Sequence, residues 1–132
     1  MNRAIVILGA TLAVAACVAD RPRSDPGQAV FDSLCAACHG SGGQGDGRVA
    51  TDLPVPPADL TALAAANGGT FPREAVMAQV YGKLGRYHDS IMPEYGPLFD
   101  GATVTVASAD GRQVERPRAL VELVDYVETL QQ

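Results

Sequence analysis

The hydrophobic and polar positions of this chain predict helices over most of its length. After Asp25-Pro26, apolar residues recur at the i, i+3, i+4, i+7 spacing of one helix face. Asp25 is a favoured N-cap residue and Pro26 suits the first helical position, so we expect a helix to begin there. The predicted stripe contains Phe31, Leu34, Cys35 and Cys38.

Three further helices and one hairpin are predicted downstream. A short helix runs from Asp59 to Ala66, and a longer one opens at Pro72 and ends at Gly85. Residues 103–107 and 112–116 alternate on either side of Asp110-Gly111, which is typical of a β-hairpin. A last helix starts at Pro117. Its buried stripe is Leu120, Leu123, Val124, Val127 and Leu130, with Tyr126 at one margin.

The first 16 residues have the pattern of a cleaved export signal. Arg3 precedes a 13-residue apolar run, Ala4 to Ala16, which is short for a membrane span. The run ends in Val-Ala-Ala-Cys17, which resembles a bacterial lipobox and predicts that Cys17 is lipidated. An ordinary secretory signal and an uncleaved anchor remain alternatives. We therefore divide the chain into a signal peptide (1–16), a tether (17–24) and one domain (25–132).

The sequence Cys35-Ala-Ala-Cys38-His39 is the strongest chemical signal in the chain. Residues three and four apart on a helix share one face, so both thiols and the imidazole are presented together. C-x-x-C-H is the c-type haem attachment signature, which makes Cys35 and Cys38 thioether anchors and His39 the proximal iron ligand. A thioredoxin-type redox pair or half of a zinc site are the alternatives. A zinc site would need Cys17 and His88, neither of which has suitable spacing.

Met92 is the predicted distal ligand. Pro93 biases Met92 toward an extended conformation, in which its thioether could be presented outward from a loop. A thioether opposite an imidazole raises the reduction potential of haem iron and fills the sixth position. His88 is the rival ligand, but its polar surroundings favour an exposed loop histidine. Met77, within a helix, is interpreted as a core residue.

Two loops after the motif are expected to lie beside the haem. Five glycines within residues 40–47 predict a backbone that passes close to the haem edge. The segment Leu53-Pro-Val-Pro-Pro57 is expected to be extended along the proximal side. Because a metal-bound histidine usually donates its other ring N–H to an oxygen, Pro54 is predicted to offer that carbonyl.

Composition narrows the possible functions. Aromatic residues make up 5% of the chain and Trp is absent, so a buried haem would supply apolar volume that the sequence lacks. The net charge is −5, and without residues 1–16 the side chains sum to 9 − 15 = −6. Such an acidic chain is not expected to bind nucleic acid. Two haem-bound cysteines and a lipidated Cys17 would leave no odd thiol.

These features together resemble a class I (mitochondrial-type) cytochrome c domain over about residues 25–132. The features are the first helix, C-A-A-C-H-G, the Gly- and Pro-rich loops, M-P-E-Y-G and the closing helix with D-Y-V-E-T-L-Q. G-Q-G-D-G and L-P-V-P-P-A-D-L-T are most similar to small bacterial monohaem cytochromes and to haem subunits of oxidases and dehydrogenases. The resemblance implies an all-α cytochrome c fold around one covalent haem c, with the first and last helices crossing near Gly27, Phe31 and Tyr126. The missing Trp and the hairpin are departures from the family pattern.

The implied function is electron transfer with His/Met ligation, by a carrier rather than an enzyme. Its expected partners are redox proteins or a membrane respiratory complex, with no small-molecule substrate. The resemblance and the lipobox place the domain at the periplasmic face, held to a membrane by lipid. An electron-entry haem subunit of a larger complex, a catalytic or gas-binding haem protein and a non-haem C-x-x-C protein are the alternatives.

Overall fold

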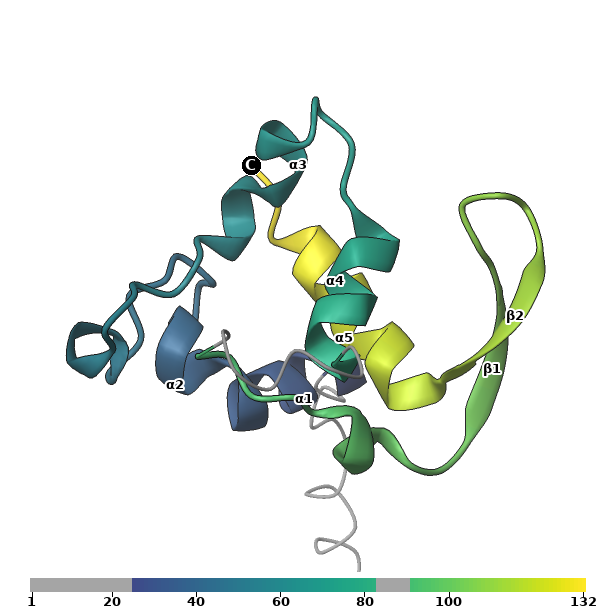
Figure 1. Ribbon diagram of the computed structural model, residues 1–132, viewed down its shortest axis with the longest axis horizontal. Helices are drawn as coiled ribbons and strands as arrows, with labels where there is room; N and C mark the ends of the chain where they lie inside the picture. Colours follow the sequence, from purple (N-terminus) through teal and green to yellow (C-terminus); the bar gives the residue numbers. More distant parts are fainter. Residues whose placement is uncertain (1–24, 83–90) are drawn as a thin grey trace, which may run out of the picture.

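The computed structural model describes residues 25–82 and 91–132, which form a mostly helical domain with one small sheet (Figure 1). Cys17 and His88, and the predicted helix end at Gly85, lie outside the described residues. The helices are α1 (Pro26–Leu34), α2 (Ala36–His39), α3 (Leu63–Ala66), α4 (Arg73–Tyr81) and α5 (Arg118–Thr129), and the strands are β1 (Thr103–Ala107) and β2 (Gln113–Pro117). Short 3₁₀ turns occupy Ala50–Asp52, Leu60–Ala62 and Gly96–Phe99.

The crossing of α1 and α5 is the centre of the core (Figure 1). Gly27 permits it, because a Cβ added there would lie 2.0 Å from the carbonyl oxygen of Glu122. Next to this contact, the rings of Phe31 and Tyr126 have centroids 5.3 Å apart at an interplanar angle of 57°. The predicted contact of Gly27 and Phe31 with Tyr126 is therefore confirmed.

Buried apolar residues extend from this crossing toward α4 and the 3₁₀ turn at residues 96–99. The most completely buried are Phe31, Leu120, Leu123 and Val124. Burying each such side chain stabilises the fold by about 1.5–3 kcal/mol. The Arg73 guanidinium on α4 forms ion pairs with Asp125 and Glu128 on α5, which fixes the two helices at their solvent side. Met77 is buried in this core, as predicted.

The helix ends follow local chemistry. The Asp25 carboxylate accepts the backbone N–H groups of Gly27 and Gln28, so the predicted start of α1 is confirmed. The helix that carries the C-x-x-C-H motif is interrupted at Cys35, where φ is −111°, and resumes as α2. The helix predicted to open at Pro72 is shorter than expected, because α4 ends at Tyr81. Gly82 follows with φ 96° and leaves the helical conformation.

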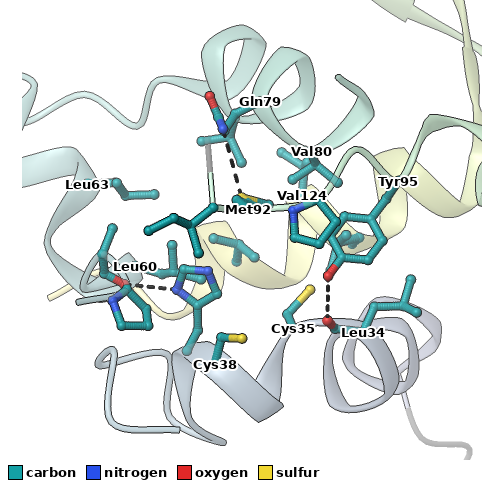
Figure 2. Close-up of a pocket in the computed structure, with 18 of the residues that line it drawn as sticks. Leu34, Cys35, Cys38, Leu60, Leu63, Gln79, Val80, Met92, Tyr95 and Val124 are labelled. Carbon is teal, nitrogen blue, oxygen red and sulfur yellow. Dashed lines mark hydrogen bonds between the residues drawn. The ribbon is translucent and has the colours of Figure 1, made fainter. Parts of the chain in front are cut away.

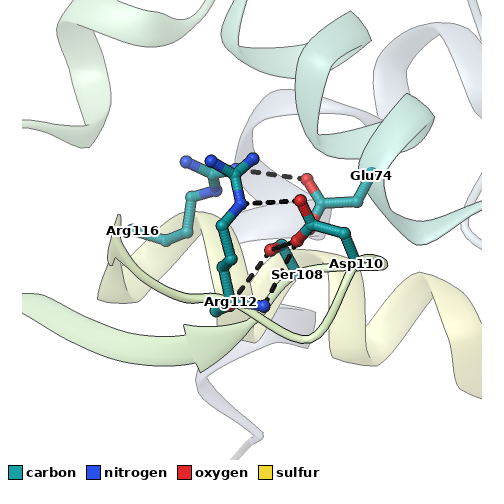
Figure 3. A network of polar contacts seen from close by, with 5 residues as sticks. All are labelled: Glu74, Ser108, Asp110, Arg112 and Arg116. Atoms are coloured by element: carbon teal, nitrogen blue, oxygen red, sulfur yellow. Dashed lines mark hydrogen bonds and ion pairs between the residues drawn. The ribbon is translucent and has the colours of Figure 1, made fainter.

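The predicted hairpin is present, and it extends away from the helices (Figure 1). The strands pair antiparallel, with Val106 opposite Val114. Figure 3 shows Arg116 of β2 contacting Glu74 of α4, an ion pair with an N···O distance of 3.2 Å. Asp110 accepts from Ser108 and Arg112 and so closes the turn. Across residues 25–82 and 91–132, no helix has both the length and the apolar content to cross a membrane.

Candidate functional site

A cavity of about 760 Å³ opens between α1–α2 on one side and α4 with the loop at residues 91–95 on the other. The Pro-rich segment 53–60 and the inner face of α5 complete its wall. Most of the lining side chains are apolar. The cavity brings together four residues that the sequence predicts to act on one cofactor: Cys35, Cys38, His39 and Met92.

The two cysteines and the histidine come from a single helical turn. The backbone N–H groups of Cys38 and His39 both donate to the carbonyl of Cys35, at 3.1 and 2.9 Å. The turn is therefore formed even though α1 is interrupted at Cys35. Figure 2 shows both cysteine side chains extending from this segment into the cavity, with Met92 across from them. Two thiols placed in this way can attach one flat group at two points.

The environment of Cys35 does not suit thiol redox catalysis. Burial, and secondarily the nearby Cys38 thiol, raise the pKa of Cys35 from its ordinary 9.0 to about 11. A redox-active cysteine needs the opposite shift, because the thiolate is the reactive form. Within the described residues, no three His, Cys, Asp or Glu side chains converge to hold a metal ion by themselves. The raised pKa of Cys35 disfavours the thioredoxin-like interpretation of the motif.

His39 is oriented through its second ring nitrogen. Nδ1 of His39 lies 2.9 Å from the carbonyl oxygen of Ala58, so an Nδ1–H tautomer would leave Nε2 as the metal-binding atom. The prediction that Pro54 offers this carbonyl is wrong: Pro54 is exposed and does not line the cavity. The Leu60 N–H donates to the carbonyl of Gly43 at 2.7 Å, which sets the register that brings Ala58 beside the ring.

The glycine-rich loop at residues 40–47 supports the proximal side from behind. The prediction that it passes the haem edge is not met, because none of its residues lines the cavity. Its glycines instead allow backbone to approach backbone. A Cβ at Gly45 would lie 2.6 Å from the carbonyl oxygen of Pro57, and one at Gly47 would lie 2.3 Å from that of Ala37. The loop therefore packs the Pro-rich segment against the helix that carries His39.

The distal side is built from α4 and the loop at residues 91–95. Met92 is half-buried and lines the cavity, and the side-chain amide of Gln79 reaches its sulfur at 3.9 Å (Figure 2). The hydroxyl of Tyr95 donates to the carbonyl of Leu34, at 3.2 Å, and so joins this loop to α1. The sequence analysis assigned no role to Gln79 and no contact to Tyr95. Gln79 could have been noticed, because it is a polar residue between Val76 and Val80, which line the same cavity.

The donor set and the size of the cavity match a covalently attached haem. Its volume lies within the range of about 300–1,000 Å³ typical of cofactor sites, and such sites are mostly apolar with few polar groups. An imidazole and a thioether both reach the cavity, beside two thiols that could anchor a macrocycle.

Comparison with known proteins agrees with this chemistry. One protein-family model matches residues 22–108, which is 87 of the 132 residues, and it describes subunit III of the cbb3-type cytochrome c oxidase. The chain belongs to this family. A cytochrome c domain of this family implies a covalently bound haem c and supports a role in haem-based electron transfer.

The matched stretch contains the haem motif, α4 and Met92 but ends within the hairpin. The contacts of β2 and α5 therefore rest on the structure alone. No curated protein matches the chain, and no solved structure matches it either.

Proposed function

We propose that this protein is a monohaem cytochrome c of the class I type that transfers electrons with His/Met ligation. In this proposal Cys35 and Cys38 form the two thioether bonds, His39 is the proximal ligand and Met92 is the distal ligand. The haem group supplies the reversible exchange of one electron at its iron. The fold holds His39 and Met92 in place and keeps water out of the cavity. No covalent bond of a partner is made or broken.

The observation that carries the proposal is the convergence of His39 and Met92 on one apolar cavity, from segments 53 residues apart in sequence. His39 is fixed by the carbonyl of Ala58, and Met92 belongs to a loop tied to α1 through Tyr95. With both side chains held in this way, His39 and Met92 would keep their positions while a bound haem gains or loses an electron. A filled sixth position also disfavours substrate or gas binding, so the protein is proposed to be a carrier rather than an enzyme.

The test is a visible absorption spectrum of the exported, matured protein, oxidised and reduced, with and without carbon monoxide. The proposal expects a low-spin c-type spectrum that the gas does not alter, with a weak sulfur-to-ferric-iron band. Met92→Ala should abolish that band and admit the gas. Met77→Leu is the matched control, since Met77 is buried in the core and should leave the band unchanged. Ready binding of carbon monoxide by the unaltered protein would refute Met92 ligation.

We further propose that the mature domain is exported and tethered to a membrane at its periplasmic face. The support is the sequence alone: the apolar run before Val-Ala-Ala-Cys17 and the polar segment 18–24. Mass spectrometry of the mature N-terminus should find a lipidated Cys17, and Cys17→Ser should release the haem protein into the soluble fraction. A mature chain that begins at another residue would contradict the lipobox.

A second candidate is an electron-entry subunit fixed in a larger membrane respiratory complex. The matched family describes an oxidase subunit, which favours this alternative, and the projecting hairpin offers a surface for such an assembly. Extraction in mild detergent followed by size separation distinguishes the two candidates. Co-elution of the haem protein with an oxidase or dehydrogenase supports the subunit, whereas elution near its own mass supports the free carrier.

A further inference from the structure

The contact between Gln79 and Met92 stands out within the cavity wall. All residues of α4 are described, and four of them line the cavity: Ala75, Val76, Gln79 and Val80. Among these four, Gln79 alone carries a polar side chain. Its Nε2 lies 3.9 Å from the Met92 sulfur, a distance suited to a hydrogen bond to this large atom (Figure 2). A thioether sulfur is a weak acceptor, so an amide N–H is a chemically matched partner.

The fold holds these two side chains together by backbone contacts between the residues that directly follow Gln79 and those shortly after Met92. The backbone N–H of Tyr95 donates to the carbonyl of Val80 at 3.0 Å, which joins the loop that carries Met92 to the last turn of α4. Gly96 packs directly against the same turn, since a Cβ there would lie 2.6 Å from the carbonyl oxygen of Tyr81. The position of Gln79 relative to the sulfur is therefore set by the α4–loop junction.

We propose that Gln79 is a positioning residue that orients the Met92 thioether and raises the reduction potential of the site. The inference rests on the proposed His39/Met92 ligation. A thioether sulfur has two lone pairs, and one can bind a metal while the other accepts a hydrogen bond. An N–H donor at the second lone pair draws electron density from the sulfur, which makes Met92 a weaker donor and disfavours the ferric state. Hydrogen bonding around an axial ligand is one of the means by which proteins set haem potentials.

Redox titration of the matured holoprotein tests this assignment. Gln79→Leu removes the donor at similar size, and Gln79→Glu keeps the shape but presents a carboxylate that cannot donate near pH 7. Gln28→Leu is the matched control, because Gln28 is also an exposed helical glutamine and does not line the cavity. At the midpoint potential of the unaltered protein, we expect Gln79→Leu to raise the ratio of oxidised to reduced protein about threefold. At 59 mV per decade this corresponds to a fall of about 28 mV. Gln79→Glu should lower the potential at least as much, since its charge also favours the ferric state.

The sulfur-to-iron band is recorded for each protein, with far-UV circular dichroism as a check of the fold. A lowered potential in both Gln79 variants, with a shifted or weakened band, supports the assignment. If the band is present in the unaltered protein and Gln79→Leu titrates like Gln28→Leu, the role of Gln79 is refuted while Met92 ligation stands. If the unaltered protein lacks the band and binds carbon monoxide, the proposed ligation itself fails, and the inference with it.

Discussion

Adding one methyl group at Gly27 tests the close packing of α1 against α5. A Cβ there would lie 2.0 Å from the carbonyl oxygen of Glu122 and 2.9 Å from the Cβ of Tyr126. Ordinary contact begins near 3.4 Å, so the shortfall against the carbonyl is 3.4 − 2.0 = 1.4 Å. Both clashing groups belong to α5 and cannot rotate away. Gly27→Ala must therefore move α1 and α5 apart.

The expected cost follows from what that separation exposes. A gap of about 0.5–1 Å already forfeits a quarter to a half of the dispersion attraction between packed groups. Phe31, Leu123 and Val124, which are 0%, 1% and 0% exposed, belong to the core that α1 and α5 share. Overpacking costs about 1–3 kcal/mol, and alanine recovers up to about 1 kcal/mol of helix propensity. With the gain subtracted from the cost, we expect the free energy of unfolding to fall by about 1–2 kcal/mol.

Urea unfolding of the holoprotein, followed by far-UV circular dichroism, measures this loss. Gly42→Ala is the matched control: a Cβ at Gly42 would meet nothing nearer than the side-chain oxygen of Gln44 at 3.8 Å. A neutral surface substitution should stay within about 0.5 kcal/mol of the unaltered protein. If Gly27→Ala is no more destabilising than Gly42→Ala, the close approach of α1 and α5 is wrong.

Three further predictions concern the distal loop and the hairpin. Tyr95→Phe removes the 3.2 Å hydrogen bond to Leu34 and should cost about 0.5–1.5 kcal/mol in urea unfolding; an unchanged free energy would contradict a role for the hydroxyl. Hydrogen bonds from Ser108, and then from Arg112, hold the pKa of Asp110 below its ordinary 3.8. The stabilisation of the turn by the carboxylate is therefore present above pH 3.8 and lost as the pH falls further, which amide exchange at Gly111 and Arg112 should report. Protection that persists unchanged through that range would refute the carboxylate's role. Glu74→Gln breaks the partly exposed ion pair with Arg116 and should cost about 0.2–1 kcal/mol, less in high salt. A double-mutant cycle with Arg116→Gln isolates the pair, and zero coupling at low salt would show that it does not hold the hairpin.

The sequence alone determined the elements whose signals are local. Asp25-Pro26 fixes the start of α1 because a carboxylate next to free N–H groups stabilises a helix end wherever it occurs. The strict alternation around Asp110-Gly111 fixes the hairpin, and the stripe from Leu120 to Val127 fixes the buried face of α5. C-x-x-C-H identified the cofactor class, because the spacing itself places the three side chains on one turn.

Only the tertiary structure decided which distant groups meet. The acceptor of His39 is Ala58 rather than Pro54, because the hydrogen bond between Leu60 and Gly43 sets the register of the Pro-rich segment. The same hydrogen bond joins Gly43 of the glycine-rich loop to the Pro-rich segment, so this loop lies behind the proximal side. The approach of Gln79 to Met92 depends on how the chain returns to α4 after residues 83–90, and no periodicity encodes that return. Local patterns specify helices through contacts between residues three or four apart in sequence. The pairings of distant groups are instead fixed by packing across the whole domain.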